Sequence, residues 1–526
     1  MCHSHNHAIY KNPVLCADYS DPDAIRAGDD YWMTSSSFCH VPGLPILHSR
    51  DLVNWTLVNH ALPALVPRDY YSTVRHGQGV WAPSIRHHAG KFWIYYPDPD
   101  FGLHVITAAN PRGAWSEPTC VKAGKGLIDP CPFWDDDGRA WLAHAWAKSR
   151  AGISSILTLH RLADDGLRVA DEGRVIIDGN ALPGHQWLEG PKIYKRNGWY
   201  YIFAPAGGVT TGFQAVFRSR AITGPYENRI VLEQGGTRIN GPHQGAWVDT
   251  PSGEHWFLHF QEIPALGRVV HLQPMRWEND WPLMGTAAAG GDGTAPGNPI
   301  LTHKNPAVAR QPAAAPATSD NFSAPALGLQ WQWQANPRSE WARVDASQKT
   351  LFLAFMPMSP DAPGSHWMTP HLFMQKFPCA DFCADVAIDF PAAQAREGDH
   401  AGLMIFGYDY AWLGLVRAPG GNLRLVLATC HYAQEGTPER ISASHALDAP
   451  ATGGLRLRVE VSNGRDCRFS HSADGKTYTP IGDVFQAASS KWVGAKVGLF
   501  AASASEAAGE PRHAAFQDFC VKEAGK

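Results

Sequence analysis

The sequence predicts an all-β protein, a five-bladed β-propeller followed by a C-terminal β-sandwich. The 526 residues include 50 glycines and 40 prolines, and only 18% of them are charged. This content of turn-forming residues, together with 20 tryptophans, favours many short strands over long helices. A repeated hairpin pattern in the first part of the chain and a two-residue alternation in the second part complete the prediction.

Five similar hairpins recur in the first part of the chain. In each, a glycine turn precedes an aromatic strand, and the glycines are 62, 48, 60 and 55 positions apart. Repeats of this length are typical of propeller blades with about four strands. A series of hairpins in a sandwich is the alternative. The five turn glycines are Gly28, Gly90, Gly138, Gly198 and Gly253.

The second part of the chain alternates apolar and polar residues. The segment Leu455-Arg-Leu-Arg-Val-Glu-Val is typical of a strand with one buried face. We therefore expect a β-sandwich of jelly-roll type. An Ala-, Gly- and Pro-rich stretch at 286–319 separates the two parts. The predicted organisation is a propeller at 8–300, a linker at 301–318 and a sandwich at 319–526.

The composition excludes several classes of protein. The formal net charge of −4 argues against nucleic acid as a partner. No apolar run of about 18 residues is present, so we expect no membrane partner. Residues 1–7 lack the pattern of a signal peptide, which predicts a cytoplasmic protein, or a secreted or periplasmic one if a leader has been removed. A homo-oligomer is compatible with the sequence.

A short polar or ionisable residue beside a proline precedes each hairpin. The equivalent ends of the innermost strands of a propeller converge on its axis, so we expect these side chains to point into one central funnel. Carboxylates gathered there repel one another, which raises at least one pKa and is usual at functional sites. The residues at these positions are Asp21, Ser84, Asp129, Glu189 and His243.

These residues lie within longer stretches that follow one another in a specific order and spacing. The stretches are Ser20-Asp-Pro-Asp, Gly79-Val-Trp-Ala-Pro-Ser, Ile128-Asp-Pro-Cys-Pro, Leu188-Glu-Gly-Pro-Lys and Gly241-Pro-His-Gln-Gly. In the second part, Gly494-Ala-Lys-Val-Gly-Leu-Phe adds to the pattern. Together they make the chain resemble glycoside hydrolase family 43, in its form with a propeller and a C-terminal sandwich.

The resemblance implies an inverting glycosidase with three essential carboxylates. It makes Asp21 the general base, Glu189 the general acid, and Asp129 the group that tunes the acid's pKa and orients it. Inversion needs a base that activates water on one face of the sugar and an acid that protonates the leaving oxygen on the other. Asp23 is the rival for the base. Asp135 lies in a hairpin turn and is expected to face solvent, without a catalytic role.

The resemblance also places Arg268 and Trp81 in the sugar subsite. An arginine can hold sugar hydroxyls, and an aromatic face can stack on a sugar ring. Phe38 and Trp146 are further candidates for substrate contact, with core packing as the alternative for Trp146. His243 is expected to hold a cation, commonly calcium, on the propeller axis, either directly or through water, with a buried core histidine as the alternative. No organic cofactor is expected.

The expected activity is the exo-acting release of β-D-xylose, α-L-arabinofuranose or both from oligosaccharides of plant cell-wall hemicellulose. The sandwich is expected to act as a rigid lid that closes the funnel into a pocket. Two alternatives are a non-catalytic glycan-binding protein and an endo-acting arabinanase, which needs an open groove. The three intact carboxylates argue against the first, and the appended sandwich argues against the second.

Overall fold

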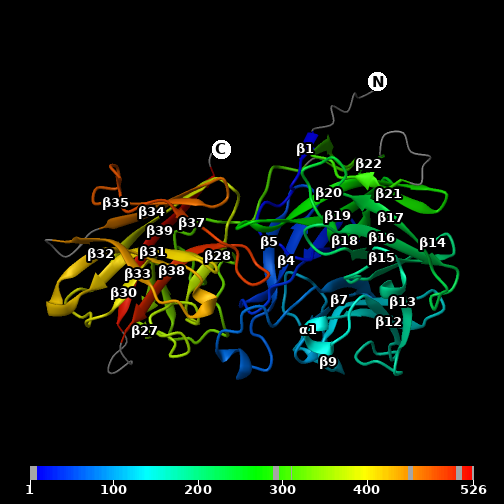
Figure 1. The fold of residues 1–526 in the computed structure, drawn as a ribbon, viewed down its shortest axis with the longest axis horizontal. Helices are drawn as coiled ribbons and strands as arrows, with labels where there is room; N and C mark the ends of the chain where they lie inside the picture. The colour runs from blue at the N-terminus through cyan, green and yellow to red at the C-terminus, as the bar shows by residue number, and fades with distance from the viewer. Residues whose placement is uncertain (1–8, 288–294, 310, 448–453, 505–511, 524–526) are drawn as a thin grey trace.

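The computed structural model describes residues 9–287, 295–309, 311–447, 454–504 and 512–523. Figure 1 shows two parts side by side, a propeller coloured blue to green and a sandwich coloured yellow to red. Both parts are built almost wholly of antiparallel strands, so the predicted fold class is confirmed.

Five antiparallel sheets follow one another along the chain and form blades 1 to 5 of the propeller. In each blade the first strand is the innermost, and the following strands lie progressively further out. Blades 1 and 2 comprise β2 (Asp23–Ala27), β3 (Asp30–Thr34), β4 (Gly43–Ser49), β5 (Thr56–Leu62), β6 (Ser84–His88), β7 (Lys91–Asp98), β8 (Gly102–Ala108) and β9 (Thr119–Ala123). Blade 3 comprises β10 (Leu127–Trp134), β11 (Ala140–Trp146), β12 (Ile156–Arg161) and β13 (Arg174–Asp178).

Blades 4 and 5 complete the ring. Blade 4 is extended at its outer edge by two short strands from the segment that follows blade 5. The two blades comprise β14 (Lys192–Arg196), β15 (Trp199–Ala206), β16 (Phe213–Ser219), β17 (Glu227–Glu233), β23 (Gly297–Asn298), β22 (Thr286–Ala287), β18 (His243–Asp249), β19 (His255–Ile263), β20 (Gly267–Glu278) and β21 (Trp281–Met284).

The five predicted turn glycines lie in the turn between the first and second strands of the five blades. Their φ angles lie between 66° and 84°, in the left-handed region that other residues rarely adopt. A Cβ added at Gly28, Gly90, Gly138 or Gly253 would meet no atom within 4 Å. At these four turns, backbone conformation and not lack of space explains the glycine.

The segment before blade 1 binds to blade 5 and closes the ring. Strand β1 (Ile9–Lys11) pairs with β24 (Thr302–Lys304), and the Val14 N–H donates to the Val270 carbonyl at 2.8 Å. The buried Asn12 amide donates to the carbonyl of Leu272, also at 2.8 Å. This closure brings the residues before β2 alongside the start of β20, which matters for the site described below.

The second part consists of two stacked sheets around one apolar core. The first sheet comprises β25 (Ala342–Asp345), β26 (Thr350–Ala354), β39 (His513–Glu523), β29 (Phe382–Asp389), β34 (Leu455–Ser462), β35 (Asp466–Ser472), β36 (Thr479–Pro480) and β37 (Phe485–Gln486). The second comprises β27 (Met356–Pro357), β38 (Lys496–Ser503), β30 (His400–Phe406), β31 (Tyr410–Arg417), β32 (Leu423–Cys430), β33 (Arg440–Ala446) and β28 (Phe373–Lys376).

A buried carboxylate joins the two parts. Asp18 accepts the backbone N–H of Arg268 on one oxygen and the backbone N–H of Gly494 on the other, each at 2.9 Å. A Cβ at Gly494 would come within 2.3 Å of the Leu266 carbonyl oxygen, so only glycine allows this close approach. The loop of the sandwich that contains Trp492 is thereby held against the propeller.

Helical structure is minor in the described part of the chain. It consists of α1 (Lys148–Ala151) and the single-turn 3-10 helices Tyr70–Ser72, Gly179–Ala181, Pro419–Gly421 and Ala433–Glu435. Within these described ranges, no helix is both long enough and apolar enough to cross a membrane.

Candidate active site

A cavity of about 330 Å³ lies where the innermost strands of the propeller begin. Its wall brings together three carboxylates from separate blades. Asp21 comes just before β2, Asp129 lies in β10, and Glu189 comes just before β14. The other lining residues are Phe38, Trp81, Ala82, Ile128, Trp187, Gly208, Val209, Gln244, Arg268 and Trp492.

Asp21 is held by three donors. Arg268 Nη1 donates to Asp21 Oδ1 at 3.0 Å, and the hydroxyls of Ser36 and Ser20 donate to Oδ2 at 2.5 and 3.2 Å. The φ angle of Asp21 is 55°, a conformation that costs about 1 kcal/mol or more in a residue with a side chain. A bond to a guanidinium is stronger than one between neutral groups. The three donors therefore fix the orientation of the Asp21 carboxylate in the cavity wall.

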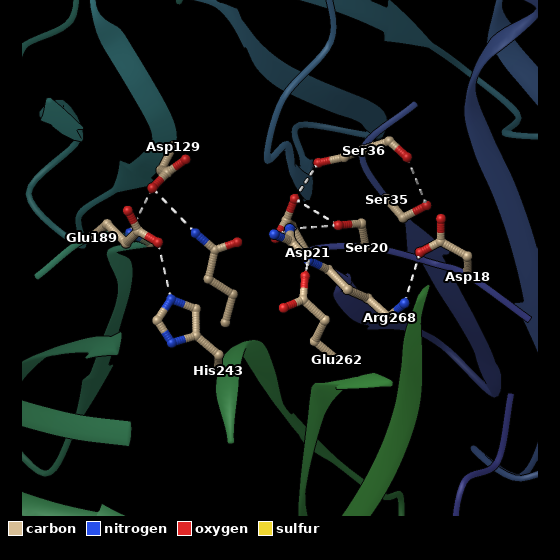
Figure 2. Close-up of polar contacts among 12 residues, drawn as sticks. Asp18, Ser20, Asp21, Ser35, Ser36, Asp129, Glu189, His243, Glu262 and Arg268 are labelled. Carbon is tan, nitrogen blue, oxygen red and sulfur yellow. Dashed lines mark hydrogen bonds and ion pairs between the residues drawn. The ribbon is translucent and has the colours of Figure 1, made fainter. Parts of the chain in front are cut away.

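Asp129 and Glu189 form a pair that is set apart from Asp21 in Figure 2. Asp129 Oδ2 accepts the Gly190 N–H at 2.7 Å and the Gln244 amide at 3.2 Å. Asp129 is only 2% exposed, whereas the Glu189 side chain is 29% exposed. Glu189 is thus the member of the pair that a ligand can reach, with Asp129 behind it.

The expected mutual repulsion of the carboxylates is found at Asp129. Burial raises the pKa of Asp129 well above its ordinary value, the Glu189 carboxylate raises this pKa further, and the Gly190 N–H opposes the rise. A proton is therefore retained at this pair at a pH where an exposed aspartate has lost it. A retained proton is what a general acid needs.

We predict that Asp129→Asn raises the melting temperature relative to the wild type, and that the difference grows as pH rises. The pKa of Asp129 is higher in the folded protein than its unfolded value of about 3.9. The wild-type protein therefore has its full folding stability below the unfolded pKa, and it loses part of this stability as pH rises through the folded pKa. The asparagine variant does not suffer this loss. Thermal unfolding of both proteins between about pH 5 and about pH 9 measures it. A difference that is constant with pH would contradict the prediction.

Arg268, at the start of β20, links Asp21 to neighbouring polar side chains. Besides Asp21, its guanidinium contacts Ser20 Oγ at 2.7 Å and Glu262 Oε1 at 3.4 Å. The guanidinium also lies 5.9 Å from the ring of Trp492. Arg268 is almost fully buried yet lines the cavity, as expected for a side chain that both orients Asp21 and offers donors to a ligand.

Aromatic side chains form much of the remaining wall. Trp81 lies between Phe38 and Trp492, with ring centroids 6.4 and 6.1 Å away in edge-to-face contacts. The Trp81 indole N–H donates to the Gly77 carbonyl at 3.0 Å, which fixes its orientation. Trp187 lies at the mouth and is about half exposed. The predicted pocket residues Trp81 and Phe38 therefore do line the cavity.

Two expectations differ from the structure. Trp146 does not line the cavity, because its indole donates to Thr158 Oγ1 at 2.9 Å and its ring packs on the cluster between blades 2 and 3. Asp135 does not face solvent. Its carboxylate is buried and accepts from Lys195 at 2.5 Å and Tyr200 at 2.6 Å, away from the cavity. These partners come from blade 4, which a local turn pattern does not reveal.

His243 begins β18 and is fully buried. Its Nε2 lies 2.9 Å from Glu189 Oε1, and its Nδ1 has no hydrogen-bond partner among the described residues. Calcium takes six to eight oxygen ligands, and a single imidazole nitrogen is a poor donor for it. The described side chains form no group of three His, Cys, Asp or Glu residues suited to a metal. These donors do not fit a calcium ion that is bound directly by protein side chains, and His243 acts here as a partner of Glu189.

Several residues of the site were not predicted from the sequence. Trp187 and Trp492 line the cavity, and Gln244 binds Asp129 from the β-bulge that follows His243. Gln244 belongs to the Gly-Pro-His-Gln-Gly stretch that contains His243, so this stretch could have pointed to Gln244 as well. Trp492 belongs to the sandwich, about 300 residues away from the nearest carboxylate in sequence, and only the packing of the two parts brings it there.

The arrangement provides the parts of an acid and base reaction in one enclosed space. Asp21, bound to Arg268, lies on one side, and the pair of Asp129 and Glu189, in which the pKa of Asp129 is raised, lies on the other. Flat aromatic side chains and buried donors surround them, as is usual where a polar ring is bound.

Comparison with known proteins assigns both parts. The model of glycosyl hydrolases family 43 matches residues 10–282, and the model of the β-xylosidase C-terminal concanavalin A-like domain matches residues 319–522. The first match runs from before blade 1 into the last strand of blade 5 and includes the three carboxylates, and the second covers the sandwich with Trp492.

Relatives are similar along nearly the full chain. A candidate β-xylosidase of Xylanibacter ruminicola is 37% identical over 93% of this chain and 85% of its own. A β-xylosidase of Formosa agariphila is 30% identical over 95% of this chain and 88% of its own. The crystal structure of a xylan β-1,4-xylosidase from Bacillus halodurans C-125 shares the fold, with a TM-score of 0.84, 23% identity, and coverage of 98% of this chain and 100% of that one. The chain belongs to family 43 of the glycosyl hydrolases.

Proposed function

We propose that the protein is an exo-acting, inverting glycoside hydrolase that releases β-D-xylose, α-L-arabinofuranose or both from hemicellulose oligosaccharides. The observation that carries the proposal is a single cavity that holds Asp21, Asp129 and Glu189 and is closed on one side by Trp492 of the sandwich. A cavity of about 330 Å³ is at the lower end of the range for ligand pockets, which suits the terminal sugar of a chain.

The mechanism assigns one role to each carboxylate. Asp21, oriented by Arg268, Ser20 and Ser36, removes a proton from a water molecule, and the water oxygen bonds to the anomeric carbon. The bond between that carbon and the glycosidic oxygen breaks, and Glu189 gives its proton to the leaving oxygen. Asp129 positions Glu189 and helps to retain the proton until it is needed. Attack opposite to the leaving group inverts the configuration.

The relatives favour a β-xyloside as the first substrate to test, since two similar proteins are named as a β-xylosidase and a candidate β-xylosidase. Trp81 and Phe38 offer faces on which a five-carbon sugar ring can stack, and Arg268 offers donors to its hydroxyls. A β-D-xylopyranoside and an α-L-arabinofuranoside can present similar hydroxyl positions to such a wall, so both belong in the test.

The test is hydrolysis of matched 4-nitrophenyl β-D-xyloside and α-L-arabinofuranoside, with proton NMR of the sugar anomer that forms first. We expect turnover of at least one substrate, with α-xylose formed first from the β-xyloside. Retained configuration would contradict the mechanism. Sugar binding without turnover of either substrate would support the glycan-binding alternative. Internal cleavage of arabinan with a mixture of oligosaccharide products would support the endo-acting one.

A further inference from the structure

A second layer of charged side chains lies directly beneath the three carboxylates. It is formed by Asp23, Arg86 and Lys192, which stand in the innermost strands β2, β6 and β14. Asp23 follows Asp21 by two residues, and Lys192 follows Glu189 by three, so each strand leads from the cavity wall into this layer. None of the three lines the cavity.

Lys192 is at the centre of this layer. Its side chain is only 3% exposed, and its ammonium group donates to the Pro83 carbonyl at 2.8 Å and to Ser84 Oγ at 2.7 Å. It also lies 3.8 Å from Asp23 Oδ1, an oxygen without a hydrogen-bond partner among the described residues. Ser84, predicted to face the funnel, is thus a ligand of this ammonium. A backbone carbonyl, a hydroxyl and a carboxylate are also the oxygen donors that a hard metal ion prefers.

The other groups of the layer fix Asp23 and add a second cation. Asp23 Oδ2 accepts the Ile85 N–H at 2.8 Å and Arg86 Nη1 at 2.6 Å, and Arg86 Nη2 donates to Cys131 Sγ at 3.0 Å. One carboxylate and two cations leave a formal charge of +1 below the three carboxylates of the cavity. Buried charges are stable only when they are paired in this way.

We infer that the ammonium group of Lys192 is the resident cation of the propeller axis and replaces a bound metal there. It links blades 1, 2 and 4 through its three oxygen partners and balances the negative charge of the cavity above it. Its charge acts on Asp129, where it opposes the rise in pKa caused by burial and by Glu189. His243 does not fit a calcium ion that is bound directly by protein side chains, which agrees with a site whose positive charge comes from the chain itself. Lys192 is a positioning residue that acts on catalysis through Asp129. Only this expected effect on catalysis rests on the proposed function.

The first experiment concerns the metal and needs no substrate. The metal content of the purified wild-type protein is measured by mass spectrometry before and after dialysis against EDTA. The melting temperature of the dialysed protein is then compared with that of the untreated protein and with that after addition of Ca²⁺. We expect well below one equivalent of divalent metal and no change in melting temperature beyond about 1 °C, since the cation is covalently part of the chain. One tightly held equivalent, whose removal lowers the melting temperature and whose return restores it, would overturn the inference.

The second experiment compares two lysines of the same strand. Lys192→Met removes the axial charge at similar volume, and Lys195→Met removes the charge of a lysine that pairs with Asp135 and Asp136 outside the cavity. We expect Lys192→Met to lower kcat about 10- to 100-fold with KM changed less than about threefold, as for a group acting on transition-state charge. We expect Lys195→Met to stay within about twofold of wild type in both. Equal effects of the two substitutions would overturn the inference.

A conservative variant separates charge from packing. Lys192→Arg keeps the positive charge, so we expect its kcat to exceed that of Lys192→Met by at least about fivefold. Equal kcat values would show that charge is not what matters and would overturn the kinetic part. If Lys192→Met does not fold, the metal measurement on the wild type still decides the inference. If the wild type hydrolyses neither glycoside, the proposed function fails while the metal measurement retains its meaning.

Discussion

Glu189→Gln lowers kcat on xylobiose by about 10²- to 10⁴-fold, because the glutamine amide cannot protonate the leaving oxygen. The substitution keeps the length of the side chain and its contact with His243, so binding of the sugar changes little. The measurement is a comparison of kcat and KM for wild type and variant on xylobiose.

The leaving group provides a control for this assignment. The dinitrophenolate group of a dinitrophenyl xyloside leaves without being protonated. The variant is therefore expected to lose far less activity on this substrate than on xylobiose. If Glu189→Gln slows both substrates equally, Glu189 is not the acid. A matched variant is Asp136→Asn, which changes an 86%-exposed carboxylate in the hairpin of blade 3 and is expected to leave both rates unchanged.

Asp21→Asn lowers kcat by about 10²- to 10⁴-fold on xylobiose and on the dinitrophenyl xyloside alike. Water must be activated whatever the leaving group, and an amide cannot take its proton. Asparagine still accepts from Ser36 and Ser20, so the fold around residue 21 is retained. Steady-state rates on the two substrates, together with a thermal melt that shows an intact fold, measure the effect.

Activity of Asp21→Asn near the wild-type level would mean that another group is the base. Asp23 is then the nearest candidate in sequence, but it is fully buried, bound to Arg86, and absent from the cavity wall. The two variants are therefore expected to differ in one respect. The loss of kcat in Glu189→Gln depends on the leaving group, and the loss in Asp21→Asn does not.

Much of this architecture could be predicted from local sequence patterns. The five turn glycines fall at equivalent places because each blade needs a positive φ between its first two strands. The same repetition predicts that residues before each innermost strand converge, and Asp21, Asp129 and Glu189 do meet in one cavity. Such features depend on a few neighbouring residues, so they can be recognised in a single chain.

The features that were missed depend on contacts between distant segments. Trp146 and Trp81 look alike in sequence, yet only Trp81 lines the cavity, since Thr158 and the packing of blades 2 and 3 hold Trp146 elsewhere. Trp492 and the bridging role of Asp18 become visible only when the sandwich is docked on the propeller. The resemblance predicted that His243 holds a cation, directly or through water, whereas its contact with Glu189 depends on the packing of blades 4 and 5 and could not be foreseen.

The bridge from Asp18 to Gly494 also limits how freely this enzyme can be recombined. Domain exchange between relatives assumes that each module carries its own function, but here one module supplies the reacting groups and the other supplies part of the pocket wall. A chimaera that combines this propeller with the sandwich of a relative keeps the three carboxylates. It loses the part of the pocket wall that fits the end of the sugar chain. Selectivity for terminal sugars thus depends on the interface between the propeller and the sandwich, and engineering it means redesigning both sides of this interface together.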